Sequence, residues 1–108
     1  MADDNLLVLL LRRRLRAAGA AAAAIPPGRY RVRAGAMAAV IVRAPDAEPV
    51  VHPDDASAAD ATVTGGMRSL LGVFVGRIGL VRAALSGGVT ASGKVWRLLG
   101  LLRAMRGR

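Results

Sequence analysis

Hydrophobic residues recur with two different spacings along this chain, one helical and one extended, and the changes between them outline its fold. Residues 3–24 open the chain with apolar positions at helical spacing, and one face gathers Leu7, Leu10, Leu11 and Leu15. Pro26-Pro27-Gly28 then ends the pattern. The chain is therefore predicted to begin with a helix over residues 3–24.

Strict alternation follows, which is typical of a half-buried strand. Between Arg29 and Arg33 the arginines point to one side and Tyr30 and Val32 to the other, so the arginine side is expected to face water. Further strands within residues 29–64 are predicted at 37–43, 49–52 and 61–64, with turn residues between them. Because these strands follow one another closely, they are expected to form an antiparallel meander.

The helical spacing returns in the C-terminal part, where helices and a last strand are predicted within residues 67–106. Two apolar faces come first, one with Met67, Leu70, Leu71 and Phe74, the other with Ile78, Val81, Ala84 and Leu85. A short strand at 89–91 precedes a final face of Val95, Leu98, Leu99, Leu102 and Met105. This order predicts one α+β domain over residues 1–108, with a mainly antiparallel sheet of about five strands and helices packed on one face.

Composition limits the chemistry of the chain more than its fold. Apolar residues make up 54% of it, but many are alanine and only Tyr30, Phe74 and Trp96 are aromatic. The absence of cysteine excludes disulfides and Cys-ligated zinc. No apolar run approaches the roughly 20 residues of a membrane span, and the acidic start differs from a signal peptide, so a cytoplasmic location is expected.

Charge is distributed unevenly. All seven acids lie at or before Asp60, whereas residues 61–108 carry eight basic residues and no acid. A C-terminal half with this positive charge attracts anionic partners, which include membrane surfaces, nucleic acid and acidic proteins. The alternative is that these arginines only keep the protein surface solvated. The three aromatics form no stacking pattern, and Arg12, Arg13, Arg14 and Arg16 suit the solvated face of a helix, so nucleic-acid binding is not favoured.

Catalytic and metal-binding motifs are incomplete. Gly88 to Lys94 fits part of a phosphate-binding loop, but Val95 stands where a hydroxyl should hold magnesium. The single histidine, His52, is followed by two acids that suit a solvated turn better than a metal site, and no serine lies in a nucleophile elbow. The sequence therefore predicts no enzyme, no metal and no cofactor.

Residues from Asp60 onward resemble a known family. Asp60-Ala61-Thr62-Val63-Thr64-Gly65 resembles a signature of bacterial sterol-carrier-protein-like domains, the sterol carrier protein type 2 superfamily. Leu70-Leu71 with Gly76-Arg77, the run from Ala84 to Val89, and the Leu98-Leu99 helix are similar to the segments that follow in that family. The resemblance covers about residues 28–105 and implies a five-stranded sheet with helices over one face, in many members enclosing an apolar tunnel for lipid.

The resemblance implies non-enzymatic binding of a lipid, fatty acyl or sterol-like ligand in a cavity between sheet and helices. The expected walls, each of which also suits an ordinary core, are Leu70, Leu71, Phe74, Ile78, Val81, Leu85, Val95, Leu98, Leu99 and Leu102. Trp96 lies off the main apolar stripe, which suits a pocket mouth, a lipid interface or a core edge. The alternatives are a ligand-free accessory module that binds a protein partner or forms a homodimer, and a basic nucleic-acid-associated protein.

Overall fold

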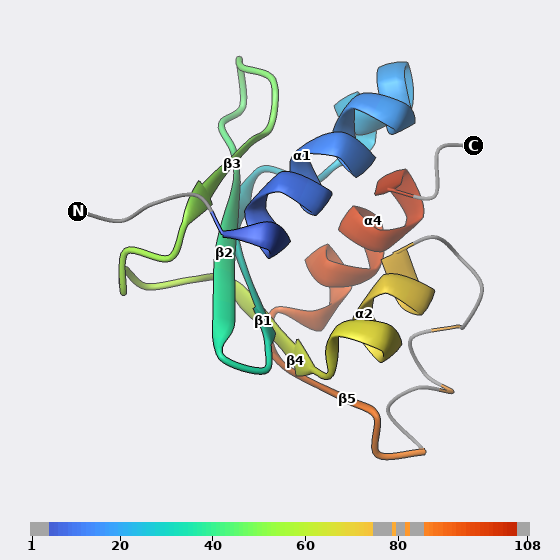
Figure 1. Cartoon of the computed structure of the whole chain (residues 1–108). Helices are drawn as coiled ribbons and strands as arrows, with labels where there is room; N and C mark the ends of the chain where they lie inside the picture. The colour runs from blue at the N-terminus through green and yellow to red at the C-terminus, as the bar shows by residue number, and fades with distance from the viewer. Residues whose placement is uncertain (1–4, 75–78, 80–81, 83–85, 106–108) are drawn as a thin grey trace.

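One five-stranded sheet carries all the helices of the described chain on one side (Figure 1). The computed structural model describes residues 5–74, 79, 82 and 86–105. In chain order its elements are α1 (Leu6–Ala18), the 3₁₀ helix η1 (Gly19–Ala24), β1 (Gly28–Ala34), β2 (Met37–Arg43), β3 (Val50–Pro53), β4 (Ala61–Gly65), α2 (Met67–Phe74), β5 (Val89–Gly93) and α4 (Val95–Met105). The helical face predicted from Ile78 to Leu85 lies outside the described residues.

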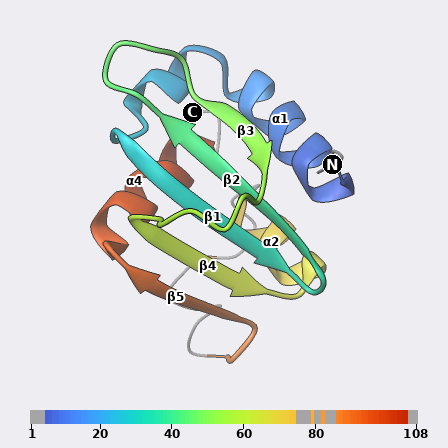
Figure 2. The same ribbon diagram turned by 90° about the vertical axis from the view of Figure 1, so that its left-hand side faces the viewer.

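The strand order is β3-β2-β1-β4-β5, so the sheet is mainly antiparallel, as predicted. The meander prediction holds for β1, β2 and β3 and is wrong for β4, which pairs with β1 in parallel, Val32 opposite Val63. Residues 54–60 make this pairing by carrying the chain across the sheet from β3 to the far side of β1. Figure 2 shows this crossover passing in front of β2 and β1 on the face without helices.

The helices cover the apolar face of the sheet. One row of buried side chains across that face is Ile41, Tyr30 and Ala61 in register, and each is no more than 1% exposed. Helix α1 packs over β2 and β3, whereas α4 packs over β4 and against η1 and α2. The predicted α+β fold class is therefore confirmed.

The predicted N-terminal helix divides at a glycine. The Asn5 side chain caps α1 by accepting a hydrogen bond from the Val8 N–H at 3.0 Å. At Gly19 the backbone adopts a φ of 57°, which favours glycine, and the α-helix ends there. The following alanines continue as the tighter η1, which turns the chain toward β1.

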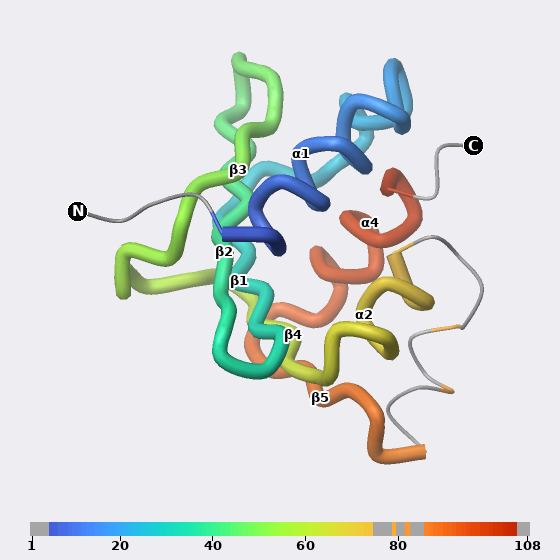
Figure 3. The backbone as a smooth tube through the Cα atoms, in the orientation of Figure 1, coloured from blue at the N-terminus to red at the C-terminus, as the bar shows by residue number. Residues whose placement is uncertain are grey.

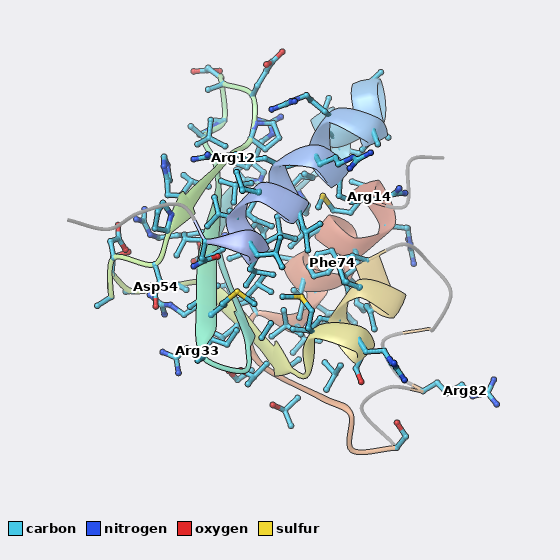
Figure 4. All side chains as sticks on the ribbon, in the orientation of Figure 1. Arg12, Arg14, Arg33, Asp54, Phe74 and Arg82 are labelled. Atoms are coloured by element: carbon cyan, nitrogen blue, oxygen red, sulfur yellow. The ribbon has the colours of Figure 1, made fainter. Side chains whose placement is uncertain are left out.

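Two of the three arginines on the outer face of β1 are covered, contrary to the sequence expectation, whereas Arg33 is exposed as expected. Arg31 is only 9% exposed because the crossover lies over it, and its Nε donates to Asp54 Oδ1 at 3.0 Å. Arg29 forms a second ion pair with Asp55 at 2.7 Å. Figure 4 shows Asp54 and Arg33 on the side of the sheet opposite Phe74, which lies in the helix layer. A tie between these arginines and the crossover therefore replaces the expected solvated face.

The two crossover acids are held in their charged form. Burial raises the pKa of Asp54, but hydrogen bonds from the Ala56 N–H and from Arg31 outweigh it and lower this pKa overall. Hydrogen bonds from the Ser57 hydroxyl and N–H, together with Arg29, lower the pKa of Asp55 to about 2. Both carboxylates therefore stay charged and paired with arginines throughout the neutral range.

Asp60 joins three strands where they meet. Its backbone N–H donates to Arg29 O at 2.7 Å, its carboxylate accepts from the Arg29 N–H at 2.8 Å, and its carbonyl accepts from the Lys94 N–H at 2.7 Å. A Cβ on residue 93 would lie 2.4 Å from Asp60 O, which is too close for a real contact. The backbone can therefore approach Asp60 this closely only because residue 93 is glycine. These contacts give the Asp60–Gly65 signature a structural role.

Candidate functional site

The predicted cavity walls are mostly packed core where the structure describes them. Ile78, Val81 and Leu85 lie outside the described residues. Of the other seven, four belong to one buried cluster and are at most 4% exposed: Leu70, Phe74, Leu98 and Leu102. Leu71 and Leu99 are half-buried, and Val95 is 37% exposed at the start of α4. These four side chains thus belong to the single core cluster of the domain.

A groove lies elsewhere between the helix layer and the sheet. It runs between α1 and η1 on one side and β3 with the β2–β3 connection on the other, and it has a volume of about 990 Å³. Figure 3 shows η1 and the β2–β3 connection standing at the same end of the molecule. This volume is at the upper end of the range of small-molecule sites, which is about 300–1,000 Å³.

The groove is mainly apolar with charges at its rim. Leu15, Ala22 and Val51 are less than 10% exposed and form its most buried part. The helical wall adds Arg12, Arg16, Gly19, Ala20 and Ala23. The opposite wall adds Arg43, Pro45, Asp46, Ala47, Glu48, Pro49, Val50 and His52. An extended apolar ligand needs a lining of this kind, with a few polar groups to fix its orientation.

Alanines leave this space unfilled. Side chains three apart in a 3₁₀ helix eclipse one another, so Ala20 and Ala23 share a face of η1, and both line the groove. A methyl group fills little volume, and Gly19 beside them adds no side chain at all. The groove therefore follows from the alanine run after the break in α1.

Two arginines hold the walls together. Arg12 on α1 donates through Nε and Nη2 to Val51 O, at 3.1 and 2.9 Å (labelled in Figure 4). Arg43 donates to Ala23 O on η1 at 3.2 Å and to the carbonyls of Ala44, Pro45 and Ala47 in the β2–β3 connection. Charge-assisted bonds to carbonyls are stronger than neutral ones, so these two side chains set the width of the groove.

Replacing Arg43 with methionine should loosen one wall of the groove. Four backbone carbonyls lose their charged donor, so hydrogen exchange of the Ala47 amide, which donates to Ala44 O, should accelerate about tenfold, equivalent to about 1.4 kcal/mol of local stability. Arg33→Met is the matched control, because Arg33 is exposed on the neighbouring strand. Exchange that stays as slow in Arg43→Met as in the control would show that Arg43 does not hold this wall.

The groove residues were not predicted from the sequence. The alanine run was interpreted as a continuation of the first helix, and residues 44–49 only as a turn. The sequence does contain two signals, six small residues in succession from Gly19 to Ala24 and a later segment bracketed by Pro45 and Pro49. Only the fold places these two segments opposite each other.

The remaining candidates for chemistry form no site in the described part of the chain. Gly88 to Lys94 runs mainly as strand β5, paired with β4 from Val89 to Gly93. No group of three or more potential metal ligands lies together among the described residues. No helix in residues 5–74 or 86–105 is both long and apolar enough to cross a membrane.

Solved structures similar to this one share a single architecture. No family model matches the sequence, and no curated protein sequence matches it either. Sterol carrier protein domain 2 of Helicoverpa armigera superposes with a TM-score of 0.69 and 18% identity, over 100% of this chain and 97% of that one. A ubiquinone synthesis protein, UbiJ-SCP2, gives 0.68 and 20% identity, over 93% of this chain and 85% of that one.

A third similar structure, palmitated SCP2L2 from Aedes aegypti, has a TM-score of 0.65 and 15% identity, over 94% of this chain and 95% of that one. All three span nearly the whole chain, and all three are sterol carrier protein 2 domains by name. The expectation drawn from the Asp60–Gly65 signature is thereby confirmed at the level of the fold. This chain has the sterol carrier protein 2 fold.

Proposed function

We propose that this chain binds an apolar ligand of the fatty acyl or similar lipid class, without transforming it, and that the ligand lies in the groove between η1 and β3. The observation that carries this proposal is the groove itself, about 990 Å³ in volume with Leu15, Ala22 and Val51 buried at its base. Burial of an acyl chain there releases water from apolar surface on both partners, which contributes about 25 cal/mol per Å².

The charges at the groove suit a ligand with an acidic head group. Three arginines line it, Arg12, Arg16 and Arg43, and they outnumber the two acids of the lining, Asp46 and Glu48. A carboxylate at this end of the groove would be attracted by the surplus of arginines, while the acyl chain lies along the alanine face of η1. A similar protein of the same fold was solved with palmitate attached or bound, as its name records, which makes palmitate a suitable probe.

Native mass spectrometry with palmitate tests the proposal. The protein is delipidated, mixed with palmitate or with hexadecanol, which has the same chain length without the carboxylate, and sprayed from volatile buffer. The expected result is one discrete palmitate adduct that saturates at one ligand per chain and disappears on acid denaturation. A protein that takes up no palmitate, or takes up a graded series of adducts without saturation, contradicts a defined site.

A protein-interaction role has one observation in its favour. Leu6 and Leu9, one turn apart on α1, are 56% and 52% exposed, which is unusual for leucines on a helix that already buries its other face. Such a pair suits a contact with a second copy or another protein. The same mass spectra measure this, because a dimer that persists while palmitate fails to bind would favour the interaction role over ligand binding.

A further inference from the structure

The indole of Trp96 is the most exposed large apolar side chain of the described residues. It is 84% exposed at the start of α4, whereas the other two aromatic residues, Tyr30 and Phe74, are at most 2% exposed. An indole combines a large apolar body with one N–H donor, and it is favoured where apolar and aqueous phases meet. Full exposure of the Trp96 indole to water is therefore less favourable than its burial at an apolar surface.

Apolar and small residues surround Trp96 on its face of α4. Helical spacing places Leu99, Gly100 and Arg103 on the same face as Trp96. The ring of Pro26 lies against this face, 2.7 Å from where a Cβ of Gly100 would stand. Val95, one residue before Trp96, is 37% exposed. We call the surface formed by Val95, Trp96, Leu99 and Arg103 the Trp96 face.

Basic side chains flank the Trp96 face. Lys94 precedes it and Arg103 ends it, and both are exposed. The one described acid nearby is Asp60, which lies 3.7 Å from Lys94 and 3.8 Å from Arg97 and offsets only part of their charge. No acid occurs after Asp60 in the sequence, so no side chain of β5 or α4 offsets the charge of Lys94, Arg97 and Arg103. An anionic surface is the complementary partner.

We propose that the Trp96 face docks this protein on an anionic lipid surface. The indole inserts at the boundary between head groups and acyl chains, where tryptophan is enriched. Lys94, Arg97 and Arg103 contact the lipid phosphates, each contributing about 1 kcal/mol near the surface. Nucleic acid fits less well, because it favours successive stacking platforms and this face offers one aromatic side chain. Docking requires no occupant in the groove and is independent of the proposed ligand.

Trp96 is the only tryptophan of the chain, so its fluorescence reports the docking directly. The full-length protein is titrated with vesicles of phosphatidylcholine and phosphatidylglycerol, and separately with vesicles of phosphatidylcholine alone. The expected result is a blue shift with the anionic vesicles only, and quenching by lipids brominated near the head group. An unchanged emission spectrum with anionic vesicles overturns the proposal, and so does a shift that single-stranded oligonucleotides produce while vesicles do not.

Matched variants separate docking at this face from general attraction between charges. Trp96→Ala should reduce co-sedimentation with anionic vesicles at least tenfold, and Lys94→Glu with Arg103→Glu should do the same. Arg13→Glu with Arg33→Glu makes the same change in net charge at two exposed positions elsewhere and should reduce binding much less. Equal losses in the two charge-reversed proteins, or full binding by Trp96→Ala, would place the contact away from the Trp96 face. Circular dichroism of each variant verifies its fold.

Discussion

Replacing Ala23 with tryptophan should weaken palmitate binding at least tenfold, equivalent to about 1.4 kcal/mol. Ala23 lines the groove from the face of η1 that it shares with Ala20, and it is exposed, so a bulky side chain there fills the groove without displacing core residues. The loss should be visible as a missing adduct in native mass spectra at palmitate concentrations that saturate the original protein.

Ala24→Trp is the control for this substitution. Ala24 belongs to the same 3₁₀ helix and is exposed, but it does not line the groove. Its tryptophan should leave palmitate binding within about twofold of the original, and both variants should unfold at similar temperatures. Full affinity of Ala23→Trp for palmitate would exclude the groove as the binding site. The palmitate adduct would then show that the lipid binds elsewhere on the protein.

Replacing Leu98 with alanine should destabilise the folded protein by about 2–5 kcal/mol, because a fully buried leucine leaves a cavity when it is truncated. Leu98 is 0% exposed and lies in the cluster that also contains Leu70 and Phe74. For a domain of this size, the midpoint of thermal unfolding should fall by roughly 10 °C or more. Urea unfolding of the delipidated protein, followed by far-ultraviolet circular dichroism, measures the change in free energy.

The matched control lies one turn earlier on the same helix. Val95, 37% exposed, was predicted alongside Leu98 as part of a ligand cavity, and Val95→Ala should cost no more than about 1 kcal/mol. These two values distinguish a packed core from a cavity wall. If Leu98→Ala unfolds like the original protein but no longer binds palmitate, Leu98 borders a ligand and not the core.

Local patterns in the sequence predict most of the elements, because each depends on neighbours in the chain. The alternation from Arg29 to Arg33 specifies β1, and the helical spacing from Val95 to Met105 specifies α4 within a residue. The Asp60–Gly65 signature points to the fold because Asp60 bonds to β1 and to the backbone before α4. A motif that joins three strands carries information about the whole sheet.

Features that depend on segments meeting across the fold were not predictable in this way. The crossover buries Arg31 beneath residues that follow it by more than 20 positions. A pattern of alternating residues within one strand does not predict such a distant contact. The groove arises where η1 faces the β2–β3 connection, and each segment alone looks like an unremarkable alanine run or turn. The predicted cavity walls stay a prediction, and the groove, whose lining the structure describes, is the site to test first.

The position of β1 between β2 and β4 bears on how the chain avoids aggregation as it is synthesised. β1, β2 and β3 are contiguous in sequence and can pair as soon as residue 53 has emerged, but the other edge of β1 waits for β4, up to residue 65. Until then that edge could pair with another chain. Arg29, Arg31 and Arg33 alternate along it, and charged residues on an unpaired edge oppose such association. Arg29 and Arg31, which later bind the crossover, thus also protect the half-formed sheet.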